Sequence, residues 1–429
     1  MVPVAVKAIL DIGIVLILGR LLGRVAVRLR QPPVIGDIFA GIALGPSLLG
    51  LLPGNIPAHL FPAAARPLLS AVAEMGVLLF LGAIGWEFEL SLLRGRKAAV
   101  AAVSVSSVLL PLLLGAGLAL LLYSGHSHVA GRTVPRAAFV LFIGVAMSAT
   151  AFPVLARILA ERGLVHTRVG TLALASAAVD DVFAWLLLAA VSAIAAPRGA
   201  ADGPLITFAL CLGYVAVMFW VVRPLLALAA RRWPAGRDPA FLAAGMAAGI
   251  FLSSYISTVI GIQSFFGAFL FGFVLPRERS AELREQLQPT FDAVSVILLP
   301  VFFIVTGLAV NLRSLSGNDL AELAALVAVA CAGKLIGAAA AARAARLTWP
   351  EARAMGLLMN TRGLTELIIL NAGVSLGVLD PPMFTMMVVM ALVATALAGP
   401  LLPGPGRLAA PTRARAPRRA ETAGALHGG

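Results

Sequence analysis

Apolar runs of about 20 residues recur along almost the whole chain, from residue 4 to residue 403. A helix of about 20 residues rises roughly 30 Å, the thickness of a bilayer core, so these runs predict membrane-spanning helices. They are continuous rather than alternating, which argues against a transmembrane β-barrel. The composition agrees, because 12% of the residues are charged, whereas soluble domains carry about 25%. We therefore expect an all-α polytopic membrane protein.

Thirteen spans are predicted from the apolar runs that lie between charge clusters. The expected ranges are 4–28, 31–50, 67–92, 98–122, 137–160, 169–195, 204–230, 239–260, 261–276, 288–312, 319–342, 351–378 and 381–403. The segment 404–429 that follows is rich in Pro, Gly, Ala and Arg and has no apolar period. We expect this basic tail to be disordered and cytoplasmic.

Positive charge is distributed unevenly between the two sides that these spans define. Of the 33 lysines and arginines, 25 fall on one side and six on the other, and Lys334 and Arg362 lie within spans. Because such residues accumulate on the cytoplasmic side, the amino terminus is expected outside and the carboxyl terminus inside, with the cell membrane as the location. The net charge of +13 is then directed at anionic lipid, and no nucleic-acid partner is needed to explain it.

The cysteines, histidines and acids of the chain are not arranged as enzyme active sites require. Cys211 and Cys331 both lie inside apolar runs, which excludes a disulfide framework, and the five histidines fall in connections or in the tail. No HExxH motif is present, and the acids do not have protease spacing. We therefore predict that the chain is not an enzyme and needs no cofactor.

Matching features in matching order suggest an internal repeat of six spans, one linker span and six spans. The paired segments are AGIALGP (40–46) with FGFVLP (271–276), LLFLGAIGWEFEL (78–90) with VFFIVTGLAVNL (301–312), and SATAFP (148–153) with NTRGLTE (360–366). An odd span between the halves makes them enter the membrane from opposite sides, as in inverted-repeat transporters. The alternative is coincidence among glycine-rich apolar helices.

Asp180 and Asp181 are the most costly residues, because they lie in the middle of one span. A carboxylate at mid-bilayer costs about 2.5–3.5 kcal/mol on insertion scales, so the pair costs on the order of 5–7 kcal/mol. Neighbouring side chains on a helix point about 100° apart, so both can border one cavity and titrate as a coupled pair. We predict a site that holds either protons or a cation; the alternative is a helix-packing hydrogen bond.

Other acids in spans lie near interfaces or beside glycines. For these we favour a hydrogen-bonded or snorkelling role over a functional one. They are Asp11, Asp37, Glu74, Glu87 and Glu89.

Lys334 lies in the middle of its span between Gly333 and Gly337, which allow close helix approach. A buried lysine needs a carboxylate partner. Asp180 is the leading candidate, which leaves Asp181 to bind the ion. The alternative is that Lys334 is a structural tether.

Two spans are interrupted by polar residues and helix breakers. Thr150 and Pro153 interrupt the fifth span, since proline lacks an amide donor and frees carbonyls in the preceding turn. The twelfth span is interrupted by Asn360, Thr361, Arg362, Gly363 and Glu366. If both helices break and cross, their half-helix ends face each other, and Arg362 and Glu366 suit the balancing of those ends better than direct ion binding.

Together these segments resemble the monovalent cation:proton antiporters, and more closely the sodium- or potassium-proton exchanger branch that includes the plant cation/H⁺ exchangers. The resemblance covers about 30–400. The segments are SATAFPVLARIL (148–159), AAVDDVFAW (177–185), GIQSFFGAFLFGFVLPR (261–277), LLPVFFIVTGLAVNL (298–312) and MNTRGLTELIILNAG (359–373).

This resemblance implies a fold of two inverted six-helix repeats with broken crossing helices, an NhaA-like architecture, and a homodimer. It assigns 1–96 and 238–318 to a scaffold and dimerisation domain, 97–200 and 319–403 to a mobile core, and 201–237 to a linker helix. By the same resemblance Asp181 binds the ion and the proton, and an acid at position 180 is typical of electrogenic members. Lys334 matches the family's core lysine by span order.

We therefore expect an antiporter that exchanges H⁺ for Na⁺ or K⁺ by an elevator motion, with Asp181 binding the cation and Asp180 and Thr150 assisting. A sodium-coupled symporter of a small organic anion is the alternative, because the same fold serves such transport. A symporter would place amides and hydroxyls at the crossing rather than two acids and a lysine.

Overall fold

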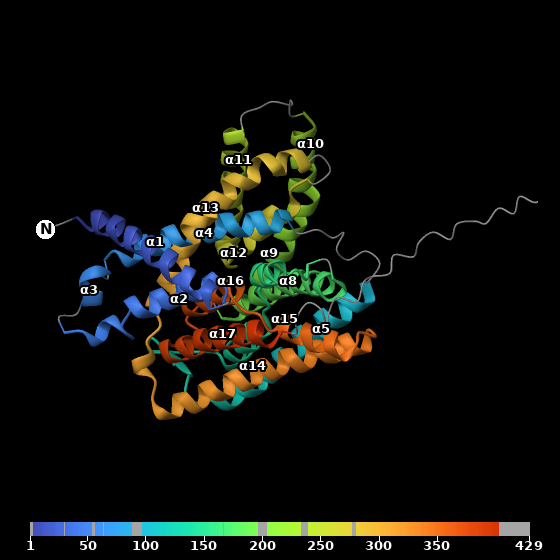
Figure 1. Ribbon diagram of the computed structural model, residues 1–429. Coiled ribbons are helices and arrows are strands. Elements are labelled where there is room, and N and C mark those ends of the chain that lie inside the picture. Colours follow the sequence, from blue (N-terminus) through green and yellow to red (C-terminus); the bar gives the residue numbers. More distant parts are fainter. Residues whose placement is uncertain are drawn as a thin grey trace, which may run out of the picture.

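The computed structural model describes residues 3–29, 31–53, 56–62, 64–87, 97–165, 167–195, 204–232, 239–276 and 280–402. The predicted disordered tail lies outside these residues, as do Glu89 and the side chain of Glu87. The described chain is an assembly of helices with one small hairpin (Figure 1). The all-α architecture expected from the apolar runs is confirmed.

The first half of the chain contains ten α-helices, one 3₁₀ helix, one π-helical turn and two short strands among the described residues. In chain order they are α1 (Val4–Arg28), α2 (Pro33–Leu44), η1 (Leu49–Leu51), α3 (Ile56–Leu60), α4 (Arg66–Glu87), α5 (Lys97–Leu122), β1 (His128–Val129), β2 (Arg132–Thr133), α6 (Arg136–Ser148), α7 (Phe152–Glu161), α8 (Arg168–Ala195), α9 (Pro204–Val217), η3 (Met218–Val222) and α10 (Arg223–Arg232).

The described part of the second half is also made of helices. Its elements are α11 (Pro239–Ile260), α12 (Ser264–Val274), α13 (Ser280–Leu308), η4 (Leu312–Ser314), α14 (Gly317–Ala344), α15 (Trp349–Met359), α16 (Leu364–Ser375) and α17 (Pro381–Leu401).

Each predicted span corresponds to a helix or to a consecutive group of helices. Ten helical stretches of the described chain are long and apolar enough to cross a membrane. The three other predicted spans are α1, which carries several charges, the short α12, and the broken pair α15–α16. One boundary differs clearly, because α13 begins at Ser280 rather than at residue 288. Its first turns carry charged residues, and hydropathy detects only the part of a helix that is apolar enough for the bilayer.

The β1–β2 hairpin follows α5 and was not predicted. Ala130 and Gly131 at its tip have φ angles of 49° and 78°. Positive φ at both central positions is the signature of the tight turn that joins two antiparallel strands. Strands of two residues are too short to leave a pattern in the sequence.

Helix contacts recur in pairs that follow the predicted repeat. The contact of α4 with α12 is matched by that of α13 with α2, and the contact of α5 with α6 by that of α14 with α15. The contacts of α5 with α8 and of α14 with α17 form a third matched pair. In Figure 1, α14 and α5 lie along the lower edge beside α17, while α4, α11, α12 and α13 lie above. The inverted repeat expected from the matching segments is thus present in the packing.

Equivalent glycines make the crossings in the two halves possible. Gly41 of α2 lies so close to α13 that an added Cβ would clash with the Ile304 carbonyl, and at Gly272 of α12 it would clash with the Gly82 carbonyl of α4. These two glycines belong to the paired segments 40–46 and 271–276. The paired segments therefore carry the same packing function in each half.

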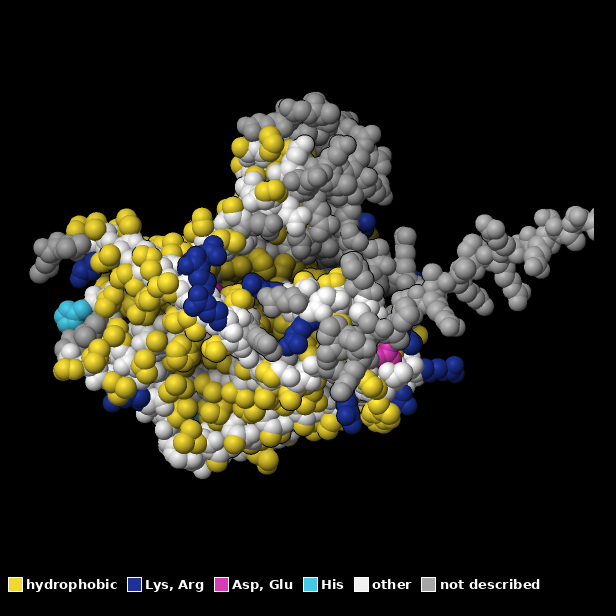
Figure 2. Space-filling model, viewed as in Figure 1, with side chains coloured by type: hydrophobic (Ala, Val, Ile, Leu, Met, Phe, Trp, Pro, Cys, Tyr) yellow, Lys and Arg dark blue, Asp and Glu magenta, His cyan; other side chains and the backbone are white. Residues whose placement is uncertain are grey.

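The surface is suited to lipid. Hydrophobic side chains cover much of the face seen in Figure 2, and Lys and Arg gather in separate groups. Large apolar side chains are widely exposed, for example Leu121 at 77% and Trp220 at 80%. Such extensive apolar exposure is expected of a bilayer-facing protein and not of a monomeric soluble one.

Candidate ion-binding site at the crossing of two broken helices

Both interrupted spans are broken where the sequence predicts. Helix α6 ends at Ser148 and α7 begins at Phe152, with Pro153 in the first turn of α7, where a missing amide proton is tolerated. Helix α15 ends at Met359 and α16 begins at Leu364. The two breaks meet directly, because the Ala151 amide donates a hydrogen bond of 3.0 Å to the Thr361 carbonyl. The helices therefore form a crossing with four half-helix ends close together.

Gly363 is required at this crossing by space. A Cβ at this position would lie 2.6 Å from Cγ2 of Val154 in α7. The side chain of Asn360 holds the break to the surrounding helices, since its Nδ2 donates to the Ala394 carbonyl at 3.2 Å and lies 3.7 Å from Cys331 Sγ. Both breaks are thus fixed by close packing.

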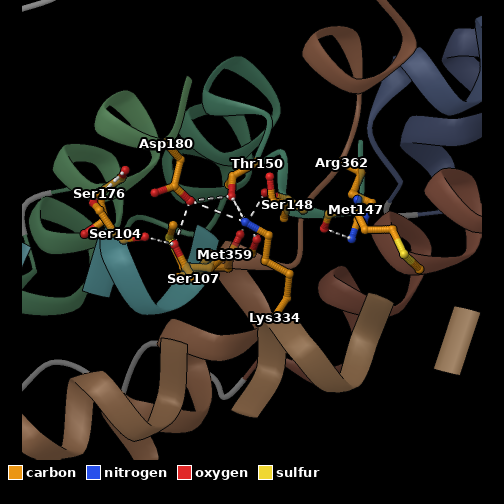
Figure 3. Close-up of polar contacts among 12 residues, drawn as sticks. Ser104, Ser107, Met147, Ser148, Thr150, Ser176, Asp180, Lys334, Met359 and Arg362 are labelled. Carbon is orange, nitrogen blue, oxygen red and sulfur yellow. Dashed lines mark hydrogen bonds and ion pairs between the residues drawn. The ribbon is translucent and has the colours of Figure 1, made fainter. Parts of the chain in front are cut away.

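Asp180 lies on α8 and is fully buried beside the first break. Its Oδ2 accepts hydrogen bonds from Ser107 Oγ at 2.7 Å, Thr150 Oγ1 at 2.9 Å and Lys334 Nζ at 3.3 Å. Lys334 also donates to Thr150 Oγ1 at 2.6 Å. Figure 3 shows the side chains of Ser107, Thr150 and Lys334 converging on Asp180. The pairing of Lys334 with Asp180 expected from the sequence is present.

Close packing of α14 against α5 brings Lys334 to this position. An added Cβ would lie 2.9 Å from Pro111 at Gly333 and 2.7 Å from the Ser106 carbonyl at Gly337. Glycines one turn apart around the lysine therefore let the two helix backbones approach. This is the arrangement predicted from the flanking glycines.

Asp181 faces a different set of groups. Its side chain, 5% exposed, has hydrogen-bonding contacts with the Thr365 side chain and the Phe152 backbone amide. These groups belong to the first turns of α16 and α7, whose amino-terminal ends are electropositive and favour a negative charge. Asp181 is therefore positioned between two half-helix amino termini, while Asp180 is neutralised by a lysine.

Each carboxylate retains an oxygen without a protein partner. Oδ1 of Asp180 and Oδ1 of Asp181 are buried and accept no hydrogen bond. A buried oxygen without a hydrogen-bond donor is costly in free energy, because it has lost its hydrogen bonds to water and has gained none within the protein. Each of these two oxygens can be satisfied by a proton or by a small cation.

Arg362 and Glu366 form a separate cluster at the same crossing. The Arg362 guanidinium donates to the carbonyls of Ala146 at 3.2 Å and Met147 at 2.8 Å, at the carboxyl end of α6, and to Glu366 Oε1 at 2.9 Å. Glu366 lies in the first turn of α16. Each charge thus faces the half-helix end of opposite sign, which is the compensating arrangement proposed from their spacing.

Two contributors to the site were missed in the sequence. Ser107 donates to Asp180, and its neighbour Ser104 donates to the Ser176 carbonyl of α8 at 3.1 Å. Thr365 contacts Asp181. Three serines (Ser104, Ser106 and Ser107) in a largely apolar helix were the available signal for the first, whereas Thr365 was hidden among the polar residues of the second break.

A buried histidine joins the ends of three helices beyond the site. His126 follows α5, and its ring nitrogens lie 2.6 Å from Asp380 Oδ2, at the start of α17, and 2.9 Å from Glu322 Oε2 of α14. The ring stacks on Phe139 of α6, and Asp319 of α14 adds a further negative charge nearby. Because both partners are acceptors, both ring nitrogens donate and the ring is an imidazolium. Burial disfavours this cation, but the hydrogen bonds to the two carboxylates outweigh that effect and raise the pKa of His126 to about 9.

This histidine is expected to make stability fall at alkaline pH. The pKa rises from about 6.5 in the unfolded chain to about 9, so the stabilisation is complete below pH 6.5 and is lost as the pH rises through 9. It amounts to about 3 kcal/mol. We expect His126→Gln to unfold at a lower temperature than the wild type at pH 6 and at a similar temperature at pH 10, measured by intrinsic fluorescence in detergent. The exposed His128 supplies the control, and His128→Gln should retain the wild-type profile. Equal melting of His126→Gln and wild type at pH 6 would contradict the assignment.

Comparisons with known proteins agree on one family. A family model described as "Sodium/hydrogen exchanger, transmembrane" matches residues 13–406. The Na(+)/H(+) antiporter NhaS4 of Synechocystis sp. is 41% identical over 91% of this chain and 95% of its own length. The cation/H(+) antiporter 15 of Arabidopsis thaliana is 36% identical over 92% of this chain, which spans 47% of that relative. The K(+)/H(+) antiporter 1 of Saccharomyces cerevisiae is 31% identical over 87% of this chain and 43% of its own length.

The fold is shared with a solved antiporter. The structure of MjNhaP1 from Methanocaldococcus jannaschii matches 93% of this chain and 96% of its own with a TM-score of 0.67, at 16% identity. The resemblance, the fold class and the function of a cation/proton antiporter predicted from the sequence are confirmed at this level, and the symporter alternative has no support. The chain spans about half the length of the plant and yeast relatives and nearly all of the cyanobacterial one. With a family match over almost its entire length, this multi-pass membrane protein belongs to the sodium/hydrogen exchanger family of secondary transporters.

Proposed function

We propose that this chain exchanges H⁺ for Na⁺ or K⁺ through a single site at the helix crossing, with Asp181 as the group that carries the ion and the proton in turn. The observation that supports this most is the pair of buried, unpartnered carboxylate oxygens on Asp180 and Asp181. The Asp181 side chain also meets the amino ends of α7 and α16, which favour its ionised form after the proton has left.

Competition between proton and cation for one carboxylate is sufficient for exchange. The ionised Asp181 attracts a cation, whose remaining ligands would come from oxygens around the crossing, such as the Thr150 hydroxyl. Protonation removes the charge and releases the cation, so the two substrates leave and arrive alternately. Lys334 neutralises Asp180 and limits the net charge of the empty site.

The elevator motion requires two groups of helices that move relative to one another. We assign residues 1–96 and 238–318 to the scaffold, 97–200 and 319–403 to the mobile core, and 201–237 to a linker. The separate packing of α4 with α12 and α13, and of α5 with α14, supports this division. We further propose a homodimer in the cell membrane with the amino terminus outside, on the basis of the charge bias and the family.

Proton flux in proteoliposomes tests the function directly. A trapped pH dye would report proton movement when Na⁺, K⁺, Li⁺ or Rb⁺ is added in turn between pH 6 and 9. Proton movement that depends on one or more of these cations supports exchange and identifies the ion. Absence of movement with all four cations, in protein shown to be folded, would contradict the proposal.

Lys334 should control the charge that is moved in each cycle. Lys334→Met leaves the Asp180 carboxylate buried without its cation, which favours uptake of a proton there. We expect this variant to change the ratio of charge to transported cation by at least twofold, measured as currents on a solid-supported membrane alongside ion flux. The double variant Asp180→Asn/Lys334→Met removes both charges and controls for the cost of the unpaired carboxylate. An unchanged ratio in Lys334→Met would make the lysine a structural tether.

A further inference from the structure

A cavity of about 190 Å³ lies away from the helix crossing, between α4, α12, α13 and α16. Its lining residues lie toward the ends of these helices that the positive-charge bias assigns to the outer face. It separates helices assigned to the scaffold from α16 of the core. Its volume is sufficient for several water molecules.

The lining is polar for a position within a membrane bundle. The polar lining residues are Ser70 and Glu74 of α4, Gln263 before α12, Thr306 of α13, and Asn371 and Ser375 of α16. Among the described residues that line the cavity, Glu74 carries the charge. Polar side chains at membrane depth are retained where they face water or a substrate pathway.

Glu74 is too deep to face hydrocarbon at acceptable cost. It lies eight residues after Arg66, the first residue of α4, which places it about 12 Å along the helix from its outer end. The side chain is exposed, and Oε1 accepts a hydrogen bond of 2.7 Å from Ser264 Oγ. A carboxylate at this depth is costly unless water or a cation solvates it, and the cavity is the space beside Glu74 that has room for either.

On the α16 wall of the cavity, hydrogen bonds fix the orientation of the Asn371 side chain. Nδ2 of Asn371 donates to Thr306 Oγ1 at 3.1 Å and to the Leu367 carbonyl at 2.8 Å. Both amide hydrogens are thereby used, so the oxygen is the group that the Asn371 side chain can offer to an ion. Oxygen ligands from carboxylate, amide and hydroxyl groups suit a hard cation.

Helix α16 connects this cavity with the proposed ion site. Thr365 in its first turn contacts Asp181, and Asn371 follows six residues later, about 9 Å along the helix. Asp180 and Asp181 do not line the cavity, and the segment between Thr365 and Asn371 is buried. The cavity and the site are therefore separate in this conformation but lie along one helix.

We propose that this cavity is an outer vestibule that collects a partly hydrated alkali cation before it reaches Asp181, with Glu74 as the residue that attracts it. The inference rests on the proposed exchange function and assigns to Glu74 a role beyond the structural one favoured from its place in the sequence. A negative charge at the mouth of a low-dielectric passage raises the local concentration of cations and falls in effect as salt increases.

The test compares cation affinity on the two faces of the membrane. In oriented vesicles, Glu74→Gln should raise the KM for outer Na⁺ or K⁺ by roughly 2- to 20-fold, the effect of one charge acting over about 10 Å. The maximal rate and the KM for cation presented at the opposite face should stay as in the wild type. Raising the ionic strength with choline chloride should reduce the difference between the variant and the wild type, because the attraction is screened.

Two further variants separate attraction from structure. Glu74→Asp keeps the charge and should retain the wild-type KM, and Ser264→Ala keeps the carboxylate while removing its hydrogen bond and should do the same. The vestibule proposal would be contradicted if Glu74→Gln raised the KM equally on both faces. It would also be contradicted if the difference from the wild type did not respond to salt, or if Ser264→Ala showed the same rise in KM. These outcomes require active wild-type protein, so they are distinct from failure of the exchange function, in which the wild type itself moves no protons.

Discussion

Asp181→Asn should abolish cation-dependent proton flux, lowering it by at least 100-fold in proteoliposomes. Asparagine has nearly the same shape, but it carries no charge to attract a cation and cannot release a proton at physiological pH. The neutral side chain can still contact Thr365 and the Phe152 amide, so the crossing of the broken helices should persist. The measurement is the dye-reported flux with the cation that is most active in the wild type.

A second buried carboxylate provides the control for this substitution. Asp11 of α1 is 1% exposed and also has an unpartnered oxygen, but it lies outside the crossing. Asp11→Asn should therefore transport at a rate similar to the wild type. If Asp181→Asn retained a flux above one tenth of the wild-type rate, Asp181 would not be the group that carries the ion and the proton.

Arg362→Met should produce the largest loss of stability among substitutions at the crossing. It leaves the buried Glu366 without its hydrogen-bonded cation and removes the donors for the carbonyls of Ala146 and Met147. Breaking a buried ion pair by removing one partner costs about 3–5 kcal/mol. We expect a large drop in the unfolding temperature, measured by fluorescence in detergent, together with lower yield.

The cost of the unpaired carboxylate can be separated from the cost of the lost carbonyl contacts. In Arg362→Met/Glu366→Gln the buried charge is absent, while the carbonyls at the end of α6 remain without their donors. This double variant should recover part of the lost stability. If it melts no higher than Arg362→Met, the interaction with α6 rather than the ion pair accounts for the loss. A single variant as stable as the wild type would contradict the role of Arg362 altogether.

Spans, helix breaks and buried charges leave local patterns in the sequence. A buried helix must satisfy its own backbone hydrogen bonds in lipid, so apolar runs predict the spans almost one for one. Charges and helix breakers inside those runs are costly, and for that reason Asp180, Asp181, Lys334 and Pro153 were identifiable without a structure. The costs belong to single residues and are visible in a one-dimensional pattern.

Contacts between distant segments could not be obtained in this way. His126 lies in a connection, where a histidine is ordinarily unremarkable, yet it joins Glu322 and Asp380 from the other half of the chain. Glu74 was assigned a structural role with the other acids that lie near interfaces or beside glycines, and its position on a cavity depends on α16, almost 300 residues away. Neither property leaves a signal in the residues on either side.

Residue patterns alone identify a helical membrane protein with an inverted repeat, two interrupted spans and a pair of costly acids. The pairing of Asp180 with Lys334 was expected, but the tertiary structure was needed to find Ser107 beside Asp180 and the amino ends of α7 and α16 beside Asp181. The physical reason is the range of the interactions. Hydropathy and helix breaking act within a turn or a span. The partner of a buried charge depends instead on how the helices pack, and packing joins residues that lie 73 positions apart, as for Ser107 and Asp180, or 154 positions apart, as for Asp180 and Lys334.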